Sequence, residues 1–150
     1  MTAIALDTNL LLLLVIGRAT GEAAGKRLKG YDDADLDILE KCLTGCDRIV
    51  VTPNVWTEIS NICGFGIEGT WLAQIQDNIV QTIHASMEIG RPSREVTADP
   101  EFGRLGLTDC VWLAVLDAET TLLTDDLALC NTALSRGLKA VNFNHLRDFG

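Results

Sequence analysis

Acidic side chains recur in this chain where a hydrophobic segment ends or a helix is expected to begin. They are Asp7, Glu58, Asp109 and the adjacent pair Asp125-Asp126. Removing a carboxylate from water is costly unless a partner compensates its charge. One Mg²⁺ or Mn²⁺ ion would compensate several carboxylates at once, since these ions prefer oxygen ligands. The pattern therefore indicates a divalent-metal site.

Each acid alone has a simpler explanation as a helix N-cap or as part of a solvated face. Several carboxylates gathered in one pocket behave differently. They repel one another and raise the pKa of at least one member, and a divalent cation relieves this repulsion. For the set as a whole, the metal site is the favoured interpretation.

Other catalytic and ligand arrangements are less well supported. No Ser-His-Asp or Cys-His combination is visible, and His84 and His145 lie outside the acidic segments, which favours ordinary surface or core positions. Cys42 and Cys46 have a spacing that could begin a zinc site, but a second pair is missing, so buried thiols are favoured. The odd number of cysteines, five, fits a reduced, cytoplasmic chain: Cys42, Cys46, Cys63, Cys110 and Cys130.

Composition predicts one compact domain over residues 1–150, because 47% of the residues are hydrophobic. The net charge of -9 argues against sequence-indifferent binding of nucleic acid, which depends on Lys and Arg. It leaves room for a local, metal-mediated contact. The apolar run from Leu10 to Ile16 is too short to span a membrane and predicts a core helix. No basic segment precedes it, so no export signal is expected.

Strands and helices are expected to alternate along the chain. Strands are predicted at residues 3–6, 48–51, 120–124 and 139–143, and helices at 9–17, 32–46, 53 onward, 71–83, 108 onward and 127–136. Thr52 and Thr108 are expected to cap the helices that follow them. Residues 90–106 are expected to form an irregular loop. This alternation predicts a three-layer α/β/α sandwich with a mostly parallel central sheet and right-handed crossovers. Ligands of such sheets gather at the carboxyl ends of the strands.

Four short motifs resemble those of the PIN-domain nucleases, which include the VapC-like toxins of toxin–antitoxin pairs. The resemblance spans nearly the whole chain, and the order and spacing of the motifs carry it. The motifs are Leu6-Asp7-Thr8-Asn9, the segment from Val51 to Ile59 that contains Glu58, the segment from Leu107 to Ala114 that contains Asp109, and Leu123-Thr124-Asp125-Asp126.

This resemblance implies metal-dependent hydrolysis of RNA phosphodiester bonds by an endoribonuclease that uses Mg²⁺ or Mn²⁺. Asp7, Glu58, Asp109 and Asp126 take the places of the family's acidic quartet, both as catalytic residues and as metal ligands. Asp125 is an acidic neighbour that could replace or assist Asp126. In-line attack of a metal-activated water on phosphorus is the expected reaction.

Thr8 resembles the family's small hydroxyl residue, which could hold a carboxylate or a metal-bound water. Its alternative role is to cap the following helix. The resemblance also implies a homodimer and, for toxin members, an antitoxin protein that covers the site. Residues 71–83 could supply the dimer face, although core packing explains their apolar positions equally well. The sequence does not separate a toxin from a housekeeping RNA-processing enzyme.

Basic residues that could contact RNA fall into two sets, each with scattered solvated charge as the alternative. Because basic surface is scarce, a structured or narrowly defined RNA is expected. Trp56, Trp71 and Trp112 could stack on bases, but core positions are favoured for them. The two basic sets are Lys26, Arg27 and Lys29, and Arg91, Arg94 and Arg104.

Two other classes of function stay open. One is a catalytically silent PIN-like scaffold for protein contacts, against which the intact acidic set argues. The other is a phosphotransfer domain, in which Asp7 would be the nucleophile. Such sites place a second Asp two residues on, where this chain has Asn9, or use a late lysine, for which Lys139 is the candidate.

Overall fold

The computed structural model describes residues 2–22, 30–66 and 71–149. Within these ranges a single parallel sheet of five strands has the order β3-β2-β1-β4-β5. The strands are β1 (Ala3–Leu6), β2 (Arg48–Val51), β3 (Met87–Glu88), β4 (Thr120–Thr124) and β5 (Lys139–Asn142). Because all of them are parallel, their carboxyl ends lie along one edge of the sheet.

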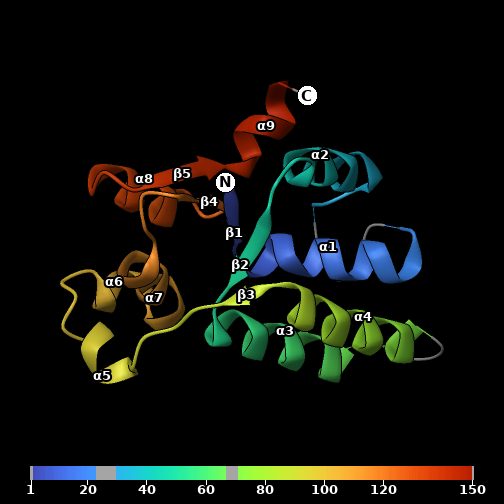
Figure 1. The fold of residues 1–150 in the computed structure, drawn as a ribbon, viewed down its shortest axis with the longest axis horizontal. Coiled ribbons are helices and arrows are strands. Elements are labelled where there is room, and N and C mark those ends of the chain that lie inside the picture. Colours follow the sequence, from blue (N-terminus) through green and yellow to red (C-terminus); the bar gives the residue numbers. More distant parts are fainter. Residues whose placement is uncertain (1, 23–29, 67–70, 150) are drawn as a thin grey trace.

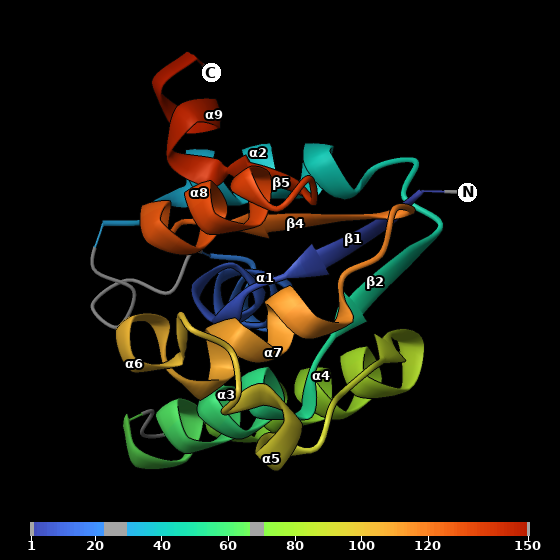
Figure 2. The ribbon, with the colours of Figure 1, turned by 90° about the vertical axis from the view of Figure 1, so that its left-hand side faces the viewer.

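Helices cover both faces of this sheet (Figure 1). Helices α1 (Thr8–Thr20), α2 (Asp33–Leu43) and α4 (Trp71–Ala85) lie on one side, and α7 (Leu107–Val115) and α8 (Leu127–Ser135) lie on the other. Figure 2 shows α7 and α8 in front of the strands after a quarter turn. Helix α3 (Pro53–Gly66) packs against α1, α4 and α7. The predicted three-layer α/β/α sandwich is confirmed.

The connections between strands leave the centre of the sheet in opposite directions. The chain passes from β1 to β2 through α1 and α2, and from β4 to β5 through α8. These two connections use opposite faces of the sheet (Figure 1), as crossovers of one hand require. The order of the strands therefore reverses between β1 and β4. Ligands of doubly wound sheets bind at such a reversal.

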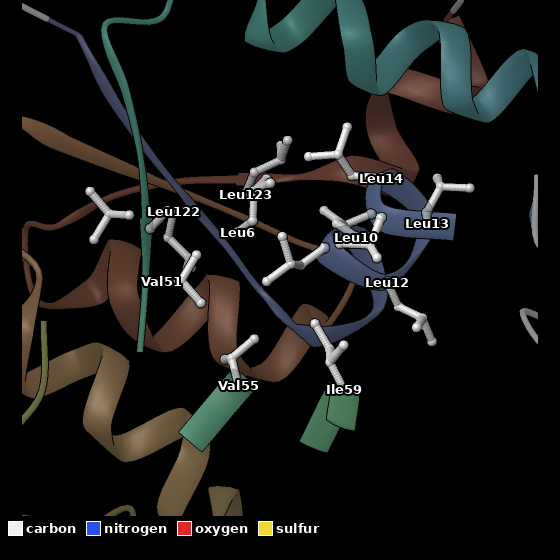
Figure 3. Close-up of a cluster of buried hydrophobic side chains, with 14 of the residues drawn as sticks. Leu6, Leu10, Leu12, Leu13, Leu14, Val51, Val55, Ile59, Leu122 and Leu123 are labelled. Carbon is white, nitrogen blue, oxygen red and sulfur yellow. The ribbon is translucent and has the colours of Figure 1, made fainter. Parts of the chain in front are cut away.

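The core is centred on α1, as its apolar sequence predicts. Residues 10–17 of this helix are all buried. Figure 3 shows side chains of α1 meeting those of β1, β2, β4 and α3. Gly17 lets α2 come close, since a Cβ built there would lie 2.5 Å from Leu36 Cδ2. None of the helices in the described ranges is long and apolar enough to cross a bilayer.

Local capping explains where two helices begin. The Thr52 hydroxyl accepts a hydrogen bond of 3.2 Å from the backbone N–H of Val55, which confirms the predicted cap of α3. Helix α2 starts with a reciprocal capping box between Asp32 and Asp35. It ends at Leu43, earlier than the predicted Cys46, because Thr44 leaves the helical conformation.

Several elements differ from the sequence-based expectation. Strand β3 has only two residues, which is too short for a recognisable alternation. The segment 90–106 is not wholly irregular, since it contains the single-turn helices α5 (Ser93–Val96) and α6 (Phe102–Leu105). The last strand ends at Asn142, whose side-chain oxygen accepts from the Asn144 N–H as α9 (Phe143–Phe149) begins.

Candidate active site

The four predicted acids come from different segments that meet at the carboxyl edge of the sheet. Asp7 directly follows β1, and Asp126 follows β4, which pairs with β1. Glu58 lies in α3, which begins directly after β2, and Asp109 lies in the first turn of α7. The charges of Asp7, Asp126 and Glu58 all act on Asp109, so the four carboxylates share one electrostatic environment.

Asp7 is buried in this site, and both of its carboxylate oxygens accept hydrogen bonds. Only 7% of the residue is exposed. The Trp112 indole N–H donates to Asp7 Oδ1 at 3.2 Å, and the Thr124 hydroxyl donates to Oδ2 at 2.8 Å. Burial raises the pKa of Asp7, and these hydrogen bonds partly oppose that rise. Asp7 occupies the N-cap position of α1 without capping it, so its carboxylate serves the site instead.

Glu58 is clamped between two threonine hydroxyls. Thr8 Oγ1 donates to Oε2 at 2.6 Å, and Thr108 Oγ1 donates to Oε1 at 2.7 Å. Thr8 was considered either as a helix cap or as a residue that holds a carboxylate. In the structure it holds the carboxylate of Glu58. The prediction that Thr108 caps α7 is wrong, since Gly106 occupies the N-cap and Thr108 faces Glu58. Glu58 is therefore hydrogen-bonded to Thr8, which follows Asp7, and to Thr108, which precedes Asp109.

Asp109 lies among the other three acids of the set. Burial raises its pKa to about 7, and the negative charges of Asp7, Asp126 and Glu58 add to the rise. None of the described residues donates a hydrogen bond to its carboxylate, so nothing in that part of the chain offsets the repulsion. The folded protein therefore favours the protonated form of Asp109 far more than water does.

The adjacent acids Asp125 and Asp126 have different roles. Asp126 Oδ1 accepts from the backbone N–H of Leu129 at 3.0 Å and caps α8. Its charge acts on Asp109. Asp125 Oδ2 instead accepts from Asn9 Nδ2 at 3.0 Å and from the Tyr31 hydroxyl at 2.5 Å. The charge of Asp126 thus acts on Asp109, whereas the charge of Asp125 acts on Asp7 and its carboxylate also anchors α1 and the segment before α2.

The donor set has the chemistry that a hard divalent cation requires, because it consists of carboxylate and hydroxyl oxygens. The unrelieved charge around Asp109 also fits a cation. Among the described residues, however, no three His, Cys, Asp or Glu side chains lie close enough together to hold an ion. The structure thus brings the acids into one region without closing them into a coordination shell.

Two donors to Asp7 were not predicted as part of the site. For Trp112 a core position was favoured over stacking on bases, and Thr124 was expected to end a strand within the last acidic motif. Trp112 lies three residues after Asp109, which places it on a nearby part of the same helix. Thr124 is the last residue of β4, and its hydroxyl also accepts from the Asp126 N–H at 3.0 Å. The sequence offered one indication of their role, which is that each lies within three residues of a predicted acid.

The tryptophans, the histidines and the two closely spaced cysteines singled out in the sequence differ in their exposure. Trp56 and Trp112 are buried, as expected, whereas 46% of Trp71 is exposed, so the core position favoured for it is wrong. His84 and His145 are exposed. Cys42 and Cys46 are free thiols, and the Cys46 thiol donates to the carbonyl of Arg48.

The basic residues differ in how they are used. Arg104 pairs with Glu101 at 2.6 Å and also donates to Thr132, so its charge is partly compensated. Arg94 is exposed, and Arg91 lines a hollow beside Glu58. The other predicted set, Lys26, Arg27 and Lys29, lies outside the described residues.

Lys139 cannot serve a phosphotransfer site at Asp7. It begins β5 and pairs with Thr121 near the start of β4. It therefore lies toward the amino ends of the strands, whereas Asp7 follows the carboxyl end of β1. Asn9, the other position relevant to that chemistry, is hydrogen-bonded to Asp125.

Comparison with known proteins adds a likeness of fold. No protein-family profile and no curated protein matches the chain. A solved structure, described as a domain of a functionally unknown protein from Methanocaldococcus jannaschii DSM 2661, is similar with 19% sequence identity and a TM-score of 0.51. The match covers 95% of this chain and 91% of that one. At this identity the likeness supports the α/β/α class of fold alone.

Proposed function

We propose that this protein is a metal-dependent endoribonuclease of the PIN type, which hydrolyses RNA phosphodiester bonds through Asp7, Glu58, Asp109 and Asp126. The observation that carries the proposal is the raised pKa of Asp109, caused by burial and by three neighbouring carboxylates. A fold maintains such repulsion at a functional site more often than elsewhere. The position of the acids at the reversal of strand order supports the same conclusion.

The four acids would hold Mg²⁺ or Mn²⁺. When bound, such an ion lowers the pKa of a water molecule and neutralises phosphate charge. The protein's own contribution is preorganisation of the ligands. Trp112 and Thr124 fix both oxygens of Asp7, and Thr8 and Thr108 fix both oxygens of Glu58. Donors of this kind orient carboxylates before a ligand arrives, so little reorganisation is needed on binding.

Asp109 is the group in this set that is suited to proton exchange near neutral pH. Its pKa of about 7 means that the empty site keeps a proton on this carboxylate part of the time. A cation must displace that proton before Asp109 can act as an anionic ligand. Cation binding is therefore expected to release protons and to strengthen as the pH rises through 7.

A catalytically silent PIN-like scaffold is the second candidate. The observation in its favour is that the described side chains do not converge into a group that could hold a metal. Under this alternative the acids would persist without binding an ion. The toxin role, the antitoxin and the homodimer remain parts of the first proposal that rest on the resemblance. The cytoplasmic location is also proposed, and it rests on the odd set of five cysteines.

Calorimetry with MgCl₂ and MnCl₂, followed by incubation of labelled structured RNAs with each ion or with EDTA, tests the proposal. We expect saturable binding of at least one ion and RNA cleavage that EDTA stops. Asp37→Asn is a matched control, because Asp37 is an exposed acid in the middle of α2 and does not line the hollow beside Glu58. It should bind and cleave as the wild type does. A protein that binds neither ion supports the scaffold alternative.

A further inference from the structure

A solvent-open hollow of about 440 Å³ adjoins the acidic site. One wall is formed by the start of α3, including Asn54 and Glu58, together with Thr108. The opposite wall is formed by Arg91, Pro92 and Ser93, which follow β3. Because Glu58 belongs to both the site and this hollow, a chain that enters the hollow meets one of the four acids.

Arg91 brings uncompensated positive charge to the hollow. Its guanidinium donates to the backbone carbonyl of Ala114 at 3.3 Å and pairs with none of the described carboxylates. Most of the other described arginines are engaged by acids. The ion pairs are Arg18–Glu40, Arg104–Glu101, Arg136–Asp99 and Arg147–Asp35.

The backbone holds Arg91 close to α3. A Cβ built on Gly90 would lie 3.3 Å from Pro53 Cδ, which is tighter than nine in ten real contacts of this kind. Glycine at this position therefore lets the segment after β3 pass directly beside the first turn of α3. The bond from Arg91 to Ala114 also fixes the guanidinium from the side of α7. Arg91 is thus positioned at the hollow from two elements.

A phosphate is the ligand that this arrangement fits best. A guanidinium matches the oxygens of a phosphate in charge and geometry, and five N–H donors leave several free after one backbone bond. The protein as a whole carries a net charge of -9 and repels a polyanion. An RNA strand therefore needs a local cation to bring a phosphate near Glu58, and Arg91 is placed for it.

The contact is limited to about one phosphate. A second hollow, of about 580 Å³, shares Gly90 and Arg91 with the first. It is also lined by Arg48, Asp117 and Glu119, so the two acids offset its positive charge and a continuing chain of phosphates gains little there. The strand is therefore held at Arg91 and not along the larger hollow.

We propose that Arg91 binds the backbone phosphate next to the scissile one in a single-stranded segment of the RNA. This inference rests on the proposed ribonuclease function. Arg91 would then set the affinity for substrate, because it contacts a part of the RNA that does not react. Its loss should raise KM more than it lowers kcat.

The test compares Arg91→Gln with Arg94→Gln, which lies in the same segment but lines neither hollow. Anisotropy of a short fluorescent oligouridylate, measured in EDTA over a range of KCl, gives affinity and its salt dependence. We expect Arg91→Gln to bind about tenfold more weakly. The slope of log affinity against log salt should fall by about 0.7, the value for one phosphate of a single strand. Arg94→Gln should match the wild type.

Cleavage in MnCl₂ separates the inference from the function on which it rests. If the wild type cleaves RNA and Arg91→Gln keeps its affinity, salt slope and KM, the inference is overturned and the nuclease stands. If the wild type neither binds nor cleaves RNA, both are overturned. If Arg91→Gln loses binding to fluorescent polyglutamate but not to RNA, Arg91 belongs to a protein interface and the RNA assignment is overturned.

Discussion

Glu58 and Thr108 are joined by a hydrogen bond of 2.7 Å, although 50 residues separate them in sequence. Thr108 directly precedes Asp109, so this bond links two acids of the site through one hydroxyl. Thr8 completes the link to Asp7 from the other oxygen of Glu58. Two threonines thus connect three of the four acids. Their hydroxyls hold Glu58 in place beside Asp7 and Asp109.

Replacing Thr108 by Val should weaken the site without disrupting the fold. Valine keeps the shape of the side chain but cannot donate to Glu58 Oε1. Loss of such an orienting bond costs about 10–100-fold in metal affinity or activity. Mn²⁺ affinity and the rate of RNA cleavage measure the effect. Thr108→Ser, which keeps the hydroxyl, is the matched control and should retain most of both.

The metal-free protein should become more stable when Asp109 is replaced by Asn. The pKa of Asp109 is about 7 in the folded protein against an ordinary value of 3.8, so the folded state favours the protonated acid. Its contribution to stability is therefore fully present below pH 3.8 and is lost as the pH rises toward 7. An asparagine side chain at this position cannot ionise, so the variant should escape this loss, on the order of 1–2 kcal/mol.

Urea unfolding of both proteins in EDTA at acidic and at slightly alkaline pH measures this difference. The two free energies of unfolding should agree at the acidic end, and the variant should be the more stable one at pH 8. Equal free energies at both pH values would show that Asp109 is not under strain from its neighbours. Added MnCl₂ should reverse the order, because the wild type alone keeps the full acidic set.

Asp125 and Asp126 should respond differently to the same change. Asp126→Asn should lower Mn²⁺ affinity about tenfold or more, since it removes a charge that acts directly on Asp109. Asp125→Asn should chiefly lower stability, by about 1 kcal/mol, because its bonds to Tyr31 and Asn9 lose their charge. Calorimetry and thermal unfolding separate the two effects. The opposite result would assign Asp125 as the fourth ligand.

Strong local signals in the sequence predicted much of the fold. The apolar run from Leu10 to Ile16 has one good solution, a buried helix, and Thr52 followed by Pro53 is a clear helix start. Strand β3 and helix α9 were not predicted. Met87–Glu88 is too short to show a period, and Phe143 extends the apolar pattern of β5. Such elements are defined by their neighbours in space.

The site was predictable in its residue types and not in its contacts. Asp7 after β1 and Asp126 after β4 indicated a common edge, because parallel strands end together. Thr108 was expected to cap α7 because a local rule favours it, yet its partner lies in α3. The different environments of Asp125 and Asp126 depend on Tyr31, which is 94 residues away from Asp125. Spacing along the chain carries no information about such contacts.

The rate of RNA cleavage by Asp7→Asn in saturating MnCl₂ tests the central claim most directly. Asparagine keeps the size of Asp7 and an oxygen for Trp112, and the Thr124 hydroxyl can rotate to accept from the amide, so the fold should persist. We predict thermal unfolding close to that of the wild type and cleavage no faster than that of the wild type in EDTA. A folded Asp7→Asn protein that cuts RNA at the wild-type rate would contradict the proposal that these acids form a nuclease site.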